Sequence, residues 1–278
     1  MKLSFYPGCS LEGMAVDYAQ SIEAVFQALD IDLVEIDDWS CCGATAAHSL
    51  SEAISVILPA RNLSAAEKMG LDIVTSCPNC FNRLSFSLQM IQKKVIDIPW
   101  QVTGDIRIYD MTRFLAAPEM IQLIKKRVLK PLIGLKFVSY YGCQMVRPPR
   151  LTGYTDYENP QTLDRITAAV GAQVIDWSYK STCCGASIGI ARKEIGESLT
   201  KRLLDKARQA GAEAIVVSCP LCQSNLDVIQ KDRPERPIPV FYFTELLRLS
   251  FSEKWPLRWF KTHLTDPVPL LKAKGLLT

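Results

Sequence analysis

The spacing of its ten cysteines limits the possible folds of this 278-residue chain more than any other feature of the sequence. Each of two sets of five has one cysteine, then an adjacent Cys-Cys pair, then a Cys-x-x-Cys segment. In both sets 34 residues separate the pair from the Cys-x-x-Cys segment. Between the first cysteine and the pair lie 31 residues in the first set and 39 in the second. Scattered cysteines would not repeat a spacing, so the chain is predicted to contain an internal duplication. The first set is Cys9, Cys41, Cys42, Cys77 and Cys80, and the second is Cys143, Cys183, Cys184, Cys219 and Cys222.

The residues around the cysteines repeat as well. LSFYPGC at 3–9 is similar to FVSYYGC at 137–143, each pair is followed by Gly-Ala, and SCPNC in the first set matches SCPLC in the second. The repeat is too long for a solenoid unit and predicts two homologous halves related by a pseudo-twofold axis. We expect a first domain at 1–130, a second at 131–250, and a tail at 251–278 that packs on the second domain.

Short apolar runs alternate with longer helical patterns in both halves. This rhythm predicts an α/β fold with parallel sheets and crossover helices, and it puts cysteines just after strands, where such sheets usually form their sites. The first half is expected to have strands at Leu3–Tyr6, Leu33–Ile36 and Leu71–Thr75, with helices at about Tyr18–Leu29 and Ser51–Met69. The second half is expected to have strands at Phe137–Tyr141 and Ala214–Val217 and a helix at Glu194–Gln209.

Composition excludes several classes of protein. Apolar residues make up 48% and charged residues 22%, as in globular proteins with a buried core. The net charge of +3 gives no support for nucleic-acid binding. There is no apolar run long enough to span a membrane, and the N-terminal segment lacks the core of an export signal. We therefore expect a cytoplasmic protein, where disulfides are rare and clustered cysteines indicate metal or redox chemistry.

Five thiols in each half indicate a metal-containing group. Thiolates are soft ligands that select zinc, copper(I) or iron–sulfur clusters. Neighbouring side chains on an extended backbone point in opposite directions, so the pair needs a bend, which Gly43 and Gly185 would permit. A zinc site and an ordinary cubane cluster each need four ligands, one fewer than each half offers. From the residues alone, four possibilities stay open: disulfides, two zinc sites, one zinc site with one cluster, and clusters in both halves.

The repeated five-cysteine pattern resembles the cysteine-rich CCG domain family, and in particular the B subunit of heterodisulfide reductase. The similarity covers nearly the whole chain and includes YPGCS, CCGATAAHS, YYGCQMVRPP, SCPLCQSNLD and the ending DPVPLLKAKGLL. It implies two α/β halves, each holding a noncubane [4Fe-4S] cluster on its five cysteines. All ten cysteines match ligand positions of the family. Zinc in one half remains a minor alternative.

The resemblance also implies a function. We expect an oxidoreductase subunit that reduces a disulfide, or oxidises the corresponding thiols, with each cluster handling one electron. Electrons would come from a small iron–sulfur subunit of the C type, fed by a flavin-bearing subunit of the A type. Two rival functions are a quinone-reactive subunit of a succinate dehydrogenase or fumarate reductase type of complex, and a non-catalytic electron relay without a cavity between its clusters.

A few other residues enter the analysis. Pro78 and Pro220 are expected at the first position of a helix, whose positive end then faces an anionic cluster. His48 is a weak candidate for proton donation near the first cluster, or simply a residue at a helix start. The loop at 146–162 either lines a substrate cleft or fills space. The aromatic and basic stretch at 253–263 either touches a membrane surface or packs on the second domain.

Overall fold

The computed structural model describes residues 1–44, 46–232 and 237–277, and the last residue of the expected tail lies outside these ranges. In the first half, strands and helices alternate as the apolar pattern predicts. The strands are β1 (Lys2–Tyr6), β2 (Asp32–Glu35), β3 (Ile73–Thr75) and β4 (Ile108–Asp110). The helices are α1 (Val16–Ala28), α2 (Ala47–Leu50), α3 (Glu52–Met69), α4 (Pro78–Gln92), α5 (Met111–Leu115) and α6 (Pro118–Arg127).

The second half repeats this order and adds short helices. Its strands are β5 (Lys136–Tyr140), β6 (Gln173–Val174), β7 (Ala214–Val217) and β8 (Val240–Tyr242). Its α-helices are α7 (Cys143–Val146), α8 (Pro149–Thr152), α9 (Thr162–Ala169), α10 (Ala186–Gly189), α11 (Lys193–Gln209), α12 (Pro220–Val228), α13 (Phe243–Ser250) and α14 (Val268–Ala273). Two 3₁₀ turns are η1 (Ile229–Asp232) and η2 (Leu257–Phe260).

Each half forms a four-stranded sheet with the same strand order, β2-β1-β3-β4 in the first and β6-β5-β7-β8 in the second. All neighbouring strands run parallel. The expected α/β fold built from two duplicated halves is thus confirmed. In each sheet the second strand pairs on one side of the first strand, and the third and fourth strands lie on the other side. The loop after the first strand and the loop after the third strand therefore run in opposite directions, which leaves a crevice between them.

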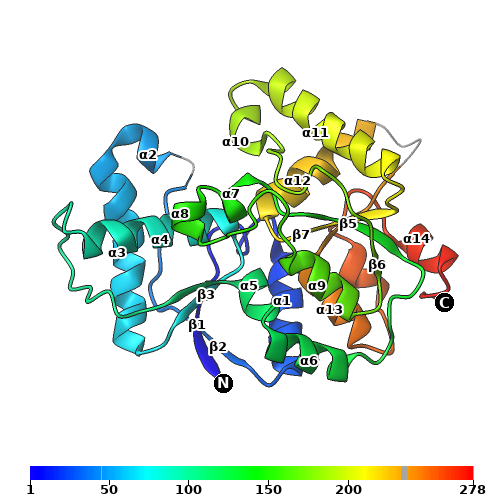
Figure 1. The fold of residues 1–278 in the computed structure, drawn as a ribbon, viewed down its shortest axis with the longest axis horizontal. Helices are drawn as coiled ribbons and strands as arrows, with labels where there is room; N and C mark the ends of the chain where they lie inside the picture. The colour runs from blue at the N-terminus through cyan, green and yellow to red at the C-terminus, as the bar shows by residue number, and fades with distance from the viewer. Residues whose placement is uncertain (45, 233–236, 278) are drawn as a thin grey trace.

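The two sheets share one hydrophobic core. Residues of α1, α5 and α6 from the first half belong to the same buried cluster as both faces of the second sheet and its helices. A smaller core lies on the other side of the first sheet, beneath α3 and α4. Figure 1 shows α3 and α4 on the left of the first sheet, with α1 on its right against the second half. Separating the halves would therefore expose a large apolar surface.

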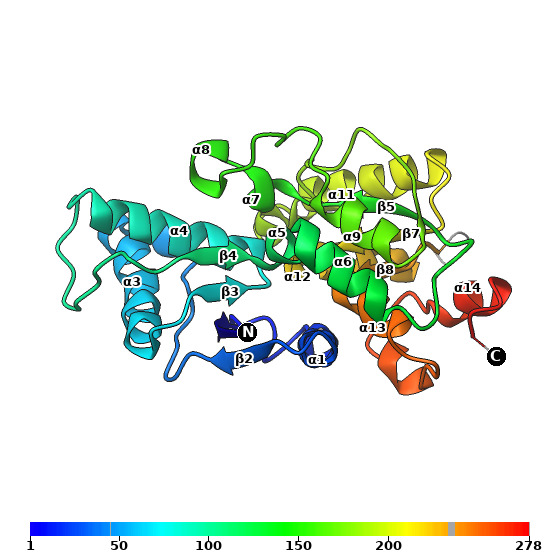
Figure 2. The same ribbon diagram turned by 60° about the horizontal axis from the view of Figure 1, so that its bottom comes forward.

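Helix α1 of the first half contacts α13 of the second half, and aromatic and polar side chains meet there. The ring of Tyr18 stacks on that of Tyr242, with the ring centroids 4.0 Å apart. Beside the stack, the hydroxyl oxygens of Ser21 and Thr244 lie 2.6 Å apart in a buried hydrogen bond. Because α1 belongs to the first half and α13 to the second, this contact fixes the relative position of the two sheets. Figure 2 shows the two helices on the same side of the molecule.

The C-terminal segment lies on the second half. The aromatic side chains of Trp255 and Phe260 are buried, and the Trp255 indole donates a hydrogen bond to the carbonyl oxygen of Leu249 at 2.6 Å. The imidazole of His263 is also buried, with Nε2 2.9 Å from a carboxylate oxygen of Glu245 on α13. Within the described residues, no helix has the length and apolar character needed to cross a membrane.

The expected helices and strands are present, and their ends differ from the predicted ones by at most two residues. The segment at 146–162, which was expected to be a loop, is different. That segment contains the single-turn helix α8 and includes the start of α9. Pro149 stands at the first position of α8, and Gly153 ends it with a φ of +71°. Proline is well suited to the first position of a helix and glycine to the left-handed conformation after it, and both residues were available as signals in the sequence.

Raising the pH is expected to remove a stabilising ion pair at His263. Burial alone lowers the pKa of a histidine, but the Glu245 carboxylate, assisted by Asp227 and Asp17, raises the pKa of His263 to about 9. Because an unfolded histidine titrates near pH 6.5, the contribution is complete below that pH and disappears as the pH rises through about 9. The shift corresponds to roughly 3 kcal/mol.

The measurement compares the thermal unfolding midpoint of the anaerobic wild-type protein with that of His263→Gln across this pH range. The difference between the two midpoints should be large near neutral pH and shrink toward alkaline pH. A difference that stays constant with pH would show that His263 contributes by packing and not by its charge.

Candidate functional site

The two parallel sheets place the cysteines at the crevices where their loops diverge. Cys9 lies in the loop after β1, and Cys77 directly precedes α4 at the end of β3. Cys143 and Cys219 have the same positions after β5 and β7. Ligand sites of α/β sheets commonly form at this switch point in the strand order. The fold therefore brings together cysteines that are far apart in the sequence.

In the first half, five free thiols converge. Sγ of Cys42 lies 3.4 Å from Sγ of Cys80. Hydrogen bonds with Cys41 and Cys80 lower the pKa of Cys42 to about 3, although burial acts in the opposite direction. Hydrogen bonds with Cys42 and Cys77 raise the pKa of Cys80. Cys77 is buried with them, whereas Cys9 and Cys41 are exposed at the rim of the site.

The second half repeats these contacts at equivalent positions. Sγ of Cys184 lies 3.5 Å from Sγ of Cys222, as in the first half. Cys143 donates to Cys183, which lowers the pKa of Cys183 to about 6 despite partial burial. The backbone N–H of Gly185 also donates to Cys183 Sγ at 3.3 Å, and Gly43 does the same for Cys41 at 3.4 Å. The duplication thus extends from the sequence to single hydrogen bonds.

The glycine after each pair has the predicted role. Gly43 and Gly185 have φ angles of +73° and +83°, in the left-handed region that side chains disfavour. The chain turns there, and this turn lets the two adjacent thiols of each pair face the same site. The expected bend is confirmed.

A second glycine allows the backbone to approach the buried sulfurs. A methyl group added at Gly8 would lie 2.9 Å from Cys80 Sγ, and one at Gly142 would lie 3.0 Å from Cys222 Sγ. Both distances are shorter than van der Waals contact allows. Gly8 and Gly142 each precede the first cysteine of a set, so the absence of a side chain brings that cysteine up to the rest.

The arrangement suits a metal–sulfur group. The thiols of each half meet at one place without forming disulfides. Pro78 and Pro220 stand at the first position of α4 and α12, as predicted, and Cys77 and Cys219 are the N-cap residues. The positive ends of two helices therefore face the sulfurs and favour negative charge there. Five soft donors per half fit an iron–sulfur cluster and exceed the four that a structural zinc ion needs.

Two tyrosines support the site, and the sequence analysis missed this role. The Tyr6 hydroxyl donates to the carbonyl oxygen of Ser40 at 2.7 Å, and the Tyr140 hydroxyl donates to that of Thr182 at 2.6 Å. Ser40 and Thr182 directly precede the cysteine pairs. Burial, and then the nearby thiolates, raise the pKa of both phenols, so they stay protonated donors. The signal was available: each tyrosine stands three residues before the first cysteine of its set.

The two sites face each other across the boundary between the halves. The side-chain amide of Asn79, within the first Cys-x-x-Cys, lies 4.0 Å from Cys219 Sγ of the second set. The buried Tyr18 phenol is near both sets as well. Burial raises its pKa most, and Asp110, Cys77 and Cys219 raise it further. The N-terminal ends of α4 and α12 thus point toward a common region.

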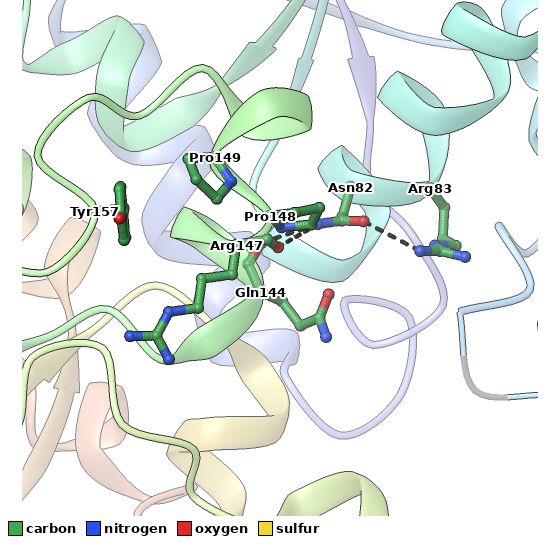
Figure 3. A pocket seen from close by; sticks show the side chains of 7 residues that line it. All are labelled: Asn82, Arg83, Gln144, Arg147, Pro148, Pro149 and Tyr157. Atoms are coloured by element: carbon green, nitrogen blue, oxygen red, sulfur yellow. Dashed lines mark hydrogen bonds between the residues drawn. The ribbon is translucent and has the colours of Figure 1, made fainter.

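A surface pocket with a volume of about 510 Å³ lies between α4 of the first half and the 144–157 segment of the second half. Arg147, Pro148, Pro149 and Tyr157 of the 146–162 segment form one wall, and Gln144 follows Cys143 directly. The side-chain amide of Asn82 joins the two walls by donating to the carbonyl oxygen of Arg147 at 2.9 Å. Figure 3 shows Arg83 and Tyr157 at opposite ends of this pocket. Its lining residues are Asn82, Arg83, Gln144, Arg147, Pro148, Pro149 and Tyr157.

The histidines have different environments. His48 is exposed on the short helix α2, and within the described part of the chain its imidazole makes no hydrogen bond to a cysteine. His263 is buried at the contact of the C-terminal segment with α13, within a group that includes Asp17 of α1. Among the described residues, the structure therefore gives neither imidazole a hydrogen bond to the thiols.

Two α/β halves that each gather five thiols at a sheet switch point define a class of cysteine-ligated redox modules. The chain belongs to the cysteine-rich CCG domain family, whose pattern matches residues 3–85 and 137–227. It is 30% identical over 266 residues to the 8-methylmenaquinol:fumarate reductase membrane anchor subunit of Wolinella succinogenes, covering 90% of this chain and 92% of that protein.

It is also similar to the B subunit of heterodisulfide reductase, as the sequence analysis indicated. The B subunit of the ferredoxin:CoB-CoM heterodisulfide reductase of Methanosarcina mazei is 29% identical over 271 residues, which cover 90% of this chain and 89% of that protein. A crystal structure of a hypothetical protein from Helicobacter pylori has the same fold, with a TM-score of 0.72 at 9% identity. The similarity covers 95% of this chain and 52% of that chain, so this chain spans about half of it.

Replacing Tyr140 with phenylalanine is expected to impair assembly of the second site more than Tyr6→Phe impairs the first. The carbonyl oxygen of Ser40 also accepts a hydrogen bond from Asn62 at 2.9 Å. Within the described residues, Tyr140 is the one side-chain donor to the carbonyl oxygen of Thr182. An unsatisfied buried acceptor costs about 1–3 kcal/mol.

Iron and acid-labile sulfide per chain after anaerobic purification provide the measurement, with the thermal midpoint as a control for folding. Tyr140→Phe should lose more iron than Tyr6→Phe. Equal iron contents in the two variants would contradict the role given to Asn62.

Proposed function

We propose that this chain is an iron–sulfur oxidoreductase subunit of the heterodisulfide reductase B type, with one noncubane [4Fe-4S] cluster in each half. The ligands would be the ten cysteines of the two sets, five per cluster. The observation that carries the proposal is the convergence of two equivalent five-thiol sites on one boundary. When bound, each cluster would supply one-electron transfer. The proposed domains are 1–130 and 131–250, followed by the tail 251–278.

The proposed reaction reduces a disulfide. One disulfide takes up two electrons and two protons and yields two thiols, and the reverse reaction oxidises the thiols. Two one-electron sites that face each other match this stoichiometry. The shared core and the α1–α13 contact hold the two sites together, and the pocket that Asn82 and Gln144 line offers space for a thiol compound.

Electrons must come from other proteins in this proposal. The relatives named as subunits act within larger reductases, and this chain is accordingly proposed to be a subunit of a complex. Its partners would be a small iron–sulfur subunit of the C type and a flavin-bearing subunit of the A type, and its location the cytoplasm. Neither nucleic acid nor a structural disulfide has a place in this function.

A second candidate is a quinone-reactive subunit, favoured by the similarity to the Wolinella succinogenes membrane anchor subunit. The tail stretch at 253–263 was the sequence feature that suggested membrane contact. Trp255 and Phe260 of that stretch are buried against the second half, while Leu257 is exposed. These two aromatic side chains are thus used for packing. We therefore favour the disulfide reaction.

Metal analysis tests the proposed cofactors. Anaerobically purified protein should contain about eight iron and eight sulfide per chain without zinc, as two four-iron clusters require. Cys42→Ser and its counterpart Cys184→Ser should each lower the iron content by about half. About four iron with one zinc in the wild-type protein would assign one half to a structural role and exclude a reaction that uses two redox sites.

Product analysis tests the reaction. With reduced viologen as the electron donor, the iron-loaded protein should convert a small asymmetric disulfide into two thiols per two electrons consumed. Two further assays test the second candidate. One measures fumarate reductase activity with menaquinol analogues, and the other measures sedimentation of the protein with anionic vesicles. Quinone turnover and vesicle binding without thiol formation would establish the second candidate.

A further inference from the structure

Arg83 lines the pocket, and it lies on the same helix as Cys80 of the first site. It follows Cys80 by three residues on α4, so the two side chains share one face of the helix. Its side chain is half-buried, donates to Asn82 Oδ1 at 3.1 Å, and lies 5.3 Å from the centre of the Phe86 ring. Within the described residues, no carboxylate forms an ion pair with it. Among the described groups, the thiolates of the first site are therefore the anions that this half-buried positive charge meets.

Cys42 is the thiol of the first site on which the Arg83 charge acts. The Arg83 guanidinium favours the charged form of this thiol. In return, Cys42 opposes the effect of burial on the pKa of Arg83. Arginine keeps its charge in proteins. Arg83 thus provides a permanent positive charge beside the Cys42–Cys80 contact.

The second half has no such charge at the equivalent position. Counted from Cys222, the residue equivalent to Arg83 is Asn225. Its amide donates to the carbonyl oxygen of Cys184 at 2.9 Å and to the Thr200 hydroxyl at 2.8 Å. A neutral amide used for backbone support therefore replaces a guanidinium. In a molecule duplicated down to single hydrogen bonds, this is a specific difference between the two sites.

Other polar groups near the two sites have a weaker electrostatic effect on them than Arg83. Asn79 approaches Cys219 at 4.0 Å, which is long even for a hydrogen bond to sulfur, and it carries no net charge. Acidic residues near Cys9 and Cys41, including Glu12 and Glu35, are exposed, and Asp38 forms an ion pair with Arg61. Water and salt screen exposed charges more strongly than half-buried ones.

We propose that Arg83 is a positioning residue that raises the reduction potential of the first-half site alone. Adding an electron makes an iron–sulfur group more negative, and a fixed neighbouring cation stabilises that state. The second half lacks this stabilisation because Asn225 is neutral. The inference rests on the proposed function, which assigns an iron–sulfur cluster to each half, and it makes the two clusters electrically different.

The test is a potentiometric titration followed by EPR on anaerobic, iron-loaded full-length protein. In Arg83→Gln, one of the two midpoint potentials should fall by about 59 mV, which corresponds to a tenfold change in the one-electron reduction equilibrium. The other midpoint should stay unchanged. Arg83→Lys keeps the charge and should retain most of the wild-type potential. Arg83→Asn, which copies the second half, should reproduce the fall if Arg83→Gln loads iron poorly.

Arg147→Gln is the matched control. Arg147 lines the same pocket, but both carboxylate oxygens of Glu158 accept hydrogen bonds from it at 2.8 Å, so its charge is neutralised. Its removal should leave both potentials unchanged. Unchanged potentials in fully loaded Arg83→Gln, or an equal fall in both Arg83→Gln and Arg147→Gln, would overturn the inference. A raised KM for the disulfide with unchanged potentials would likewise overturn it and make Arg83 a substrate-binding residue.

Failure of the proposed function would have a different result. If the wild-type protein lacks iron in one half, the metal analysis shows this before any variant is titrated. If the wild-type protein holds two clusters but reduces no disulfide, the titration still tests Arg83, because its readout is a potential and not turnover.

Discussion

The close approach of five thiols in each half is the constraint on which the rest of the structure depends. Sulfur atoms only 3.4 Å apart cannot all be ionised in a buried place, so some thiols keep a proton and donate it to their neighbours. The contact between Cys42 and Cys80 accordingly lowers the pKa of Cys42 and raises that of Cys80. Binding a cation is the change that allows every thiol to ionise. The protein must hold the sulfurs together against their repulsion, and the features around them serve this purpose.

Those features oppose the repulsion in three ways. The N-terminal ends of α4 and α12 supply positive potential. Gly8 and Gly142 remove the steric barrier between the first cysteine and the last. Tyr6 and Tyr140 hold the backbone in front of each Cys-Cys pair. Each operates in both halves, which is why the duplicated sequence keeps glycine, tyrosine and proline at matching distances from the cysteines.

Much of this could be predicted from the sequence, for identifiable reasons. The alternation of apolar runs predicted the parallel sheets, and the proline and glycine next to the cysteines predicted the helix starts and the bends. The contact between α1 and α13 could not be predicted, because Tyr18, Ser21, Tyr242 and Thr244 carry no local signal of their tertiary partners. The shared core was missed for the same reason: periodicity shows which face of a helix is buried, but not against which sheet. Helix α8 was missed although Pro149 and Gly153 mark its two ends.

Duplication explains why the sites are alike, and α4 explains why they differ. A helix that presents a cysteine at its start must also present the residues one turn later, and these are Arg83 in the first half and Asn225 in the second. Asn225 donates to the carbonyl oxygen of Cys184, whereas Asn62 on α3 donates to that of Ser40, the residue before the first pair. A reaction that passes two electrons through two sites has no need for identical potentials, and the divergence of this one position provides a physical means to separate them.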